Sequence, residues 1–78
     1  MHEFNILLRS FRDVEQFVSL AMVQPFEVTV SCKDKRINGK NYMGMSTLDF
    51  SRPLQVLAKC SDDDFARFRS DASAFLIE

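Results

Sequence analysis

Apolar side chains recur at every second position in three segments, a period typical of a β-strand with one face on a core. These segments are residues 3–8, residues 26–32 and residues 54–60. The middle segment is the clearest, because it is also rich in β-branched side chains. A turn at residues 33–34 leads into a shorter return strand at residues 36–38. The alternation therefore predicts four strands.

Helical spacing separates the first two of these strands. Asp13 is the predicted N-cap of this helix, and Gln16 lies at the capping-box spacing three residues later. Pro25 is expected to end the helix. The predicted buried face consists of Val14, Phe17, Val18, Ala21 and Met22.

Two further helices are predicted in the second half of the chain. Asn41 is placed to cap a short helix over Tyr42 to Phe50, and Pro53 ends the loop that follows. Ser61 is placed to cap the last helix, whose first turn carries three aspartates that favour the positive end of the helix dipole. Its predicted apolar face consists of Phe65, Phe68, Ala72, Phe75 and Leu76.

The predicted order is β-α-β-β-α-β-α, within a chain short enough for a single domain over residues 1–78. A half-apolar antiparallel sheet needs a cover on one face, and the helices supply it. We therefore predict an α+β open-faced sandwich, with a four-stranded antiparallel sheet covered on one face by three helices.

Composition and charge exclude several classes of function. The net charge is −1, with 10 basic residues against 11 acidic ones, and no basic stripe typical of a nucleic-acid binder is present. Cys32 and Cys60 belong to no CxxC pair, so they are expected to be buried thiols and not metal ligands. The N-terminus lacks the features of a signal peptide, and no apolar run is long enough to span a membrane. A cytoplasmic protein is expected.

Catalytic constellations are also missing from the sequence. The single histidine, His2, leaves no Ser-His-Asp or Cys-His arrangement to assemble. Only two glycines are present, Gly39 and Gly44, so there is no glycine-rich phosphate loop. The acidic run at residues 62–64 is interpreted as helix-capping charge. We expect neither an enzyme nor a bound cofactor or metal.

The run Asn38-Gly39-Lys40-Asn41-Tyr42-Met43-Gly44-Met45-Ser46-Thr47-Leu48 resembles the regulatory-serine segment of HPr, the histidine phosphocarrier of the bacterial sugar phosphotransferase system. That family commonly has Asn-x-Lys-Ser-Ile-Met-Gly-x-Met-Ser-Leu there. Lys40, Met43, Gly44 and Leu48 match position by position. The predicted order of elements and the chain length are also those of HPr. The resemblance therefore implies an HPr-like fold.

Both phosphorylation sites of that family are missing. HPr carries phosphate on a Gly-x-His-Ala-Arg-Pro loop, whereas residues 10–13 form a segment about three residues shorter that contains no histidine. His2 is expected to be a solvated terminal residue, Asp13 a cap and Arg12 a solvated side chain. Asn41 stands in place of the regulatory serine, and neither Ser46 nor Thr47 matches its position.

The resemblance also implies a docking surface for enzyme I and other proteins of the system. The matching positions are Tyr42, Met43 and Ser46, with Phe11 and Arg12 nearby. Tyr, Met and Phe are frequent interface residues, because each contributes a large apolar area. The alternative is that Tyr42 and Met43 pack over the sheet edge.

The leading hypothesis is a non-catalytic HPr-like module that binds or regulates a protein related to the phosphotransferase system. The alternative is a phosphocarrier that uses a non-standard acceptor. A third possibility is a vestigial domain that self-associates through the sheet edge at residues 36–38. The sequence identifies neither the partner nor the oligomeric state.

Overall fold

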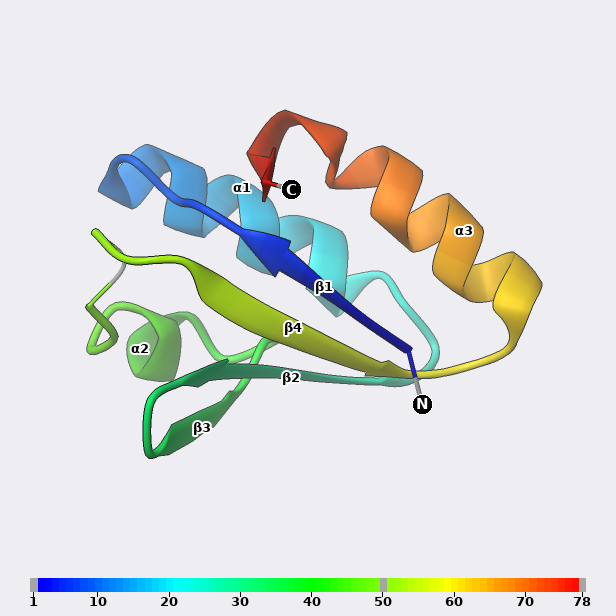
Figure 1. Cartoon of the computed structure of the whole chain (residues 1–78), viewed down its shortest axis with the longest axis horizontal. Coiled ribbons are helices and arrows are strands. Elements are labelled where there is room, and N and C mark those ends of the chain that lie inside the picture. Colours follow the sequence, from blue (N-terminus) through cyan, green and yellow to red (C-terminus); the bar gives the residue numbers. More distant parts are fainter. Residues whose placement is uncertain (1, 50, 78) are drawn as a thin grey trace.

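The computed structural model of the chain describes residues 2–49 and 51–77. The chain has an α+β fold, in which the helices pack on a sheet whose strand pairs are all antiparallel (Figure 1). The bounds, in chain order, are β1 His2–Ile6, α1 Phe11–Met22, β2 Glu27–Cys32, β3 Lys35–Asn38, α2 Tyr42–Met45, β4 Leu54–Lys59, α3 Asp62–Asp71, a 3₁₀ turn at Ser73–Phe75, and β5 Leu76–Ile77.

The sheet has five strands in the order β3-β2-β4-β1-β5, one strand more than predicted. The extra strand, β5, comes from the predicted end of the last helix. There the chain leaves the helix through the 3₁₀ turn, and Ile77 and Leu76 pair with Asn5 and Ile6 of β1. Pairing satisfies backbone groups that an open edge of β1 would leave to solvent. Phe75 is buried, as the helical spacing predicts, but Leu76 belongs to a strand.

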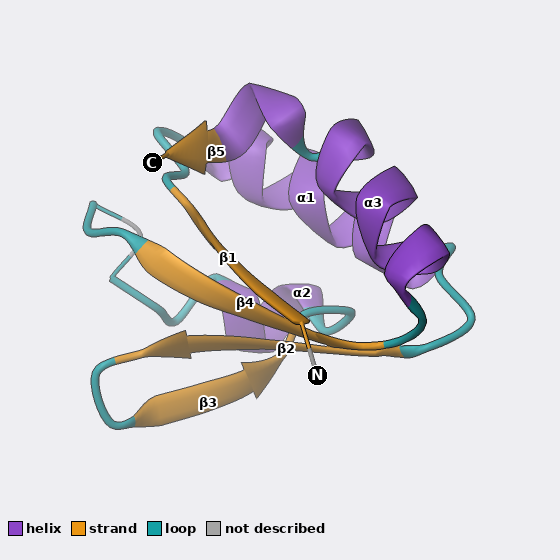
Figure 2. Cartoon of the chain, turned by 45° about the vertical axis from the view of Figure 1, so that its right-hand side comes forward, coloured by secondary structure: helices purple, strands orange, loops and turns teal. Residues whose placement is uncertain are grey.

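The helices lie on one face of the sheet and leave the other open (Figure 2). Alternating residues of each strand point toward the helices, because successive side chains of a strand face opposite sides. Phe68 of α3 lies at the centre of the aromatic packing, with its ring centroid 5.6 Å from that of Phe4 and 5.7 Å from that of Phe26. The buried apolar residues are Phe4, Ile6, Leu8, Val14, Phe17, Val18, Ala21, Val28, Val30, Met45, Leu48, Leu54, Val56, Ala58, Phe68, Ala72 and Phe75.

Helix α1 begins three residues earlier than predicted. Ser10, and not Asp13, is the N-cap, because its hydroxyl accepts a hydrogen bond from the Asp13 N–H at 3.3 Å. The Asp13 carboxylate in turn accepts from the Arg9 N–H at 2.9 Å. The two side chains therefore close the start of the helix together, in a variant of the capping box.

Helix α2 is shorter than predicted and ends at Met45, followed by a turn at Ser46 and Thr47. Phe50, the predicted end of this helix, lies outside the described residues. The predicted caps Asn41 and Ser61 are confirmed, since their side chains accept from the N–H groups of Gly44 and Asp64 at 3.2 Å each.

The first and fourth strands are also shorter than the alternation predicts. Leu8 lies beyond the end of β1 and Cys60 beyond the end of β4, although Leu8 still reaches the core. Within the described part of the chain, no helix combines the length and apolar character needed to cross a membrane.

Candidate interaction surface

The first turn of α1 presents Phe11 and Arg12 to solvent. Because Ser10 caps the helix, Phe11 is its first residue, and 58% of Phe11 is exposed. In the described structure this turn holds no histidine, and its nearest carboxylate, Asp13, bonds to the backbone of Arg9. The side chains of Ser10 and Asp13 therefore accept hydrogen bonds from backbone N–H groups at the start of this helix.

Exposed apolar residues lie along one edge of the buried face of α1. Each residue turns the helix by about 100°, so Met22 lies about 40° beyond Val18, the last residue of the buried arc. Phe11 and Met22 lie about 20° apart on this same side. Met22 is 62% exposed and the following Val23 is 76% exposed. The prediction that Met22 belongs to the buried face is therefore wrong.

Helix α2 contributes the other half of the surface. Met45 is buried in the core, and the same short helix directs Met43 outward, with 74% of its surface exposed. Tyr42 is 36% exposed. Ser46 is half-buried at the C-terminal end of α2, where its hydroxyl donates to the Met43 carbonyl at 2.8 Å.

The structure brings Tyr42 against the exposed side of α1. Tyr42 lines an open depression of about 350 Å³ together with Glu15, Val18, Ser19 and Met22. Phe11 and Arg12 do not line this depression, and Phe11 lies one helical turn before Glu15 on the same side of α1. We call the set Phe11, Met22, Val23, Tyr42 and Met43 the α1–α2 surface.

Sequence reasoning named Phe11, Tyr42 and Met43 of this surface and missed Met22 and Val23. A helical wheel drawn from the Ser10 cap would have placed Met22 outside the buried arc, because its angle matches that of Phe11. Val23 is the C-cap residue, where the helix ends and side chains leave the helical pattern.

His2 lies far from this surface, at the opposite end of β1 from α1. Its ring stacks on Phe65 with centroids 4.6 Å apart, and its Nε2 lies 2.7 Å from Asp62 Oδ1. The prediction of a solvated terminal residue is therefore wrong: the side chain is half-buried against α3. His2 and Ile6 are the first and last residues of β1, so four residue steps, or about 13 Å, separate them.

The two cysteines are free thiols, and both are half-buried, whereas the sequence predicted full burial. Burial, together with the nearby Asp64 and Asp62 carboxylates, raises the pKa of Cys60. Among the described residues, no group of three His, Cys, Asp or Glu side chains could hold a metal ion. The three aspartates of residues 62–64 occupy the first turn of α3, as predicted.

The predicted edge strand is confirmed as β3, which lies at the end of the sheet beside β2. Ile37 is half-buried there, whereas Arg36 and Asn38 are exposed. Arg36 lies on the open face with Glu27, Thr29, Leu57 and Lys59, which together line a shallow depression.

Comparison with solved structures bears directly on the fold. The chain is similar to HPr-C-His from Thermoanaerobacter tengcongensis, with a TM-score of 0.76 over 95% of this chain and 93% of that chain. It has the HPr-like fold. The sequence identity is 20%, so this likeness concerns the fold alone. No protein-family model and no curated protein sequence matches the chain.

The HPr-like fold explains why the α1–α2 surface forms. Helices α1 and α2 pack against each other, and Tyr42 of α2 lies beside Met22 of α1. Figure 1 shows α1 and α3 side by side above the sheet, with α2 apart from α3. The exposed apolar side chains of α2 therefore lie against the C-terminal half of α1, and Phe11 extends the surface toward the start of α1.

Proposed function

We propose that this HPr-like chain is a non-catalytic module that binds a protein partner through the α1–α2 surface. The observation that carries the proposal is the grouping of the exposed large apolar side chains. Every such side chain among the described residues lies on α1, on its C-cap or on α2. Exposed apolar residues that gather in one region are typical of a protein-binding surface.

The chemical character of the surface supports a protein partner. Two methionines and two aromatic rings provide adaptable apolar contacts, and Arg12 and Glu15 add charge beside them. The surrounding groups contain no constellation for nucleophilic or general-base chemistry, since the one histidine lies beside α3. Binding, and not turnover, fits these groups.

The partner we propose is enzyme I or another protein of the sugar phosphotransferase system, and the role is regulatory. The fold supports this choice, because a chain with an HPr-like shape can occupy a site that receives HPr. Without an acceptor at the start of α1, such a complex would block phosphate transfer and not relay it.

For the alternative function, a phosphocarrier with a non-standard acceptor, His2 is the first acceptor to consider. Three aspartates occupy the helix turn beside this ring, and Asp62 already contacts its Nε2. Their negative charge opposes the approach of a phosphoryl donor. This arrangement supports the binding module over the carrier.

The test combines labelled phosphoenolpyruvate with a binding titration against enzyme I. We expect no acid-labile label on the chain and saturable binding by enzyme I. The double substitution Tyr42→Gln with Met43→Gln should weaken binding by about 2 kcal/mol, or about 30-fold, because anchor residues dominate interface energies.

Leu57→Gln is the matched control, since it replaces an apolar side chain on the open face of the sheet. We expect this variant to bind enzyme I like the unmodified chain. Acid-labile label on His2 would replace the proposal with the carrier. Equal loss of binding in both variants would show that the partner does not use the α1–α2 surface.

A further inference from the structure

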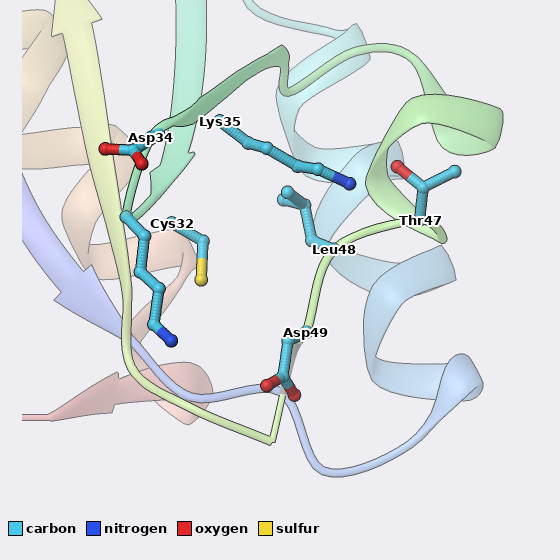
Figure 3. A pocket seen from close by; sticks show the side chains of 7 residues that line it. Cys32, Asp34, Lys35, Thr47, Leu48 and Asp49 are labelled. Atoms are coloured by element: carbon cyan, nitrogen blue, oxygen red, sulfur yellow. The ribbon is translucent and has the colours of Figure 1, made fainter.

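A second site lies on the other side of α2, between the β2–β3 turn and the segment that follows α2 (Figure 3). It is a cavity of about 330 Å³. Small-molecule sites in proteins occupy about 300 to 1,000 Å³, so the cavity has the size of a small ligand. Its lining residues are Cys32, Lys33, Asp34, Lys35, Thr47, Leu48 and Asp49.

The floor of this cavity is apolar. Leu48 is buried in the core, and Cys32 is half-buried and packs against the same core. Figure 3 shows the Cys32 thiol and the Leu48 side chain both directed between the turn and the following segment. The floor therefore offers contact to the apolar part of a ligand.

Lys33 of the turn and Lys35, the first residue of β3, place their positive charges at the rim. Within the described structure, neither side chain forms a hydrogen bond or an ion pair, although the charge of Lys33 attracts the Asp49 carboxylate from a greater distance. Figure 3 shows the Lys35 ammonium extending toward Thr47, whereas Asp34 lies on the opposite side of the cavity from Thr47. Asp34 therefore does not neutralise Lys35.

The remaining carboxylate, Asp49, is already bound by its own loop. It accepts hydrogen bonds from the Ser51 hydroxyl and from the Ser51 N–H, the latter at 3.3 Å. Arg52 Nε lies 3.4 Å from its second oxygen. The hydrogen bond from Ser51 is the main cause of the lowered pKa of Asp49, with smaller effects from Arg52 and Lys33.

The backbone of the β2–β3 turn adopts an uncommon conformation at Lys33. Lys33 has φ 54°, in the left-handed region that glycine or asparagine adopts more readily. A lysine at this position is less favourable than glycine or asparagine, because its Cβ crowds the backbone in this region. The turn nevertheless places an ammonium group beside the cavity.

We propose that this cavity binds a small organic anion, whose carboxylate or phosphate end lies between the ammonium groups of Lys33 and Lys35 and whose apolar part lies on Leu48 and Cys32. None of the lining residues belongs to the α1–α2 surface, so this site is independent of the proposed function.

The experiment is an amide NMR titration of the full chain with benzoate and, separately, with its neutral analogue benzamide. Benzoate should cause saturable shifts confined to residues 32–35 and 47–49, and benzamide should bind at least about tenfold more weakly. The double substitution Lys33→Gln with Lys35→Gln should weaken benzoate binding by about tenfold. Lys59→Gln, on β4 away from the cavity, is the matched control and should leave binding unchanged.

Phenyl phosphate, titrated in parallel, distinguishes a phosphate ester from a carboxylate as the preferred anion; tighter binding of either one supports the site. Equal binding of benzoate and benzamide would overturn the proposal, and this comparison needs no variant. So would a double variant that binds benzoate like the unmodified chain, or the absence of saturable shifts up to about 10 mM benzoate.

Discussion

Helices α1 and α3 pack on the same face of the same sheet but present different surfaces to solvent (Figure 2). The outward side of α3 is charged, with three aspartates in its first turn and Arg69 in its last. None of its large apolar side chains is exposed, and the structure describes all of α3. The outward side of α1 instead carries Phe11 and Met22, both more than half exposed.

This difference shows that the exposed apolar residues of α1 are not a consequence of the small size of the domain. A chain of 78 residues has limited apolar area to bury, yet α3 of this chain leaves none of its large apolar side chains exposed. The same sheet and solvent therefore allow a helix whose outer side exposes no large apolar side chain. The exposed apolar side chains on α1 and α2 therefore need another explanation, and we propose that a binding partner covers them.

The largest predicted effect is the loss of fold stability when the packing of α3 on the core is weakened. Phe68 is the one fully buried residue of α3, and its ring contacts those of Phe4, Phe17 and Phe26. Phe68→Ala should lower the free energy of unfolding by about 3 to 5 kcal/mol, because the core cannot close over the cavity. Urea denaturation followed by circular dichroism measures it. A loss below about 1 kcal/mol would show that α3 is not anchored by Phe68.

The next effect concerns the cap of α3. Ser61→Ala should cost about 1 kcal/mol, since it removes the acceptor for the Asp64 N–H and leaves the aspartates of the first turn without their cap. Ser10→Ala removes the corresponding bond to the Asp13 N–H at the start of α1 and is the matched variant. The Asp13 carboxylate remains to hold the start of α1, so the cost there should be smaller. The denaturation midpoints of the two variants measure this difference, and equal losses of stability would contradict the prediction.

A smaller effect is expected for the exposed residues of the α1–α2 surface. Met22→Gln and Met43→Gln should each change the free energy of unfolding by less than about 0.5 kcal/mol, because neither side chain is buried. Met45→Gln, in the core, is the contrasting variant and should destabilise strongly. A large loss of stability in Met22→Gln or Met43→Gln would mean that these residues hold the fold together instead of receiving a partner.

The smallest effect is on the titration of Cys60, just before α3. Burial and the Asp64 and Asp62 carboxylates raise its pKa, so the folded state favours the neutral thiol. The stability that this adds is fully present below the ordinary thiol pKa and is lost as the pH rises through the raised value.

In a Cys32→Ser background, alkylation of Cys60 should begin at a higher pH than alkylation of a free thiol. Adding Asp64→Asn should lower the pH at which the reaction begins, because it removes a negative charge that disfavours the thiolate. An unchanged pH profile in the Asp64→Asn variant would show that the acidic turn of α3 does not act on this thiol.

Much of the fold could be predicted from local patterns. Alternation located β2 and β4 to within a residue at each end, and side-chain caps located the starts of α2 and α3. These elements are set by local interactions: the alternation decides which face is buried, and a Ser or Asn hydroxyl or amide closes the helix start.

The errors arose where two local solutions competed or where a distant segment decided the outcome. Ser10 and Asp13 are both good caps, and the hydrogen bond from the Arg9 N–H to Asp13 favours the earlier start. The last residues of the chain continue a helical spacing, but β1 offers an open edge that only the folded sheet creates. His2 meets Phe65 across about sixty residues of sequence, a contact that no local pattern reports.

Part of the candidate surface could be predicted from the sequence, and part of it could not. Tyr42 and Met43 were named from the resemblance to HPr, whereas Met22 was missed because its spacing fits the buried face nearly as well. The cavity beside Lys33 had no signal in the sequence, because it forms between a turn and a loop that are distant along the chain.

The most direct measurement of the central claim is methyl NMR of the methionines during titration with enzyme I. Met22 and Met43 lie on the α1–α2 surface, and Met45 of the same helix as Met43 is buried and serves as the internal control. We predict that the methyl signals of Met22 and Met43 shift or broaden with saturation while that of Met45 does not. Unchanged signals from Met22 and Met43, with binding detected at other residues or not at all, would contradict the account.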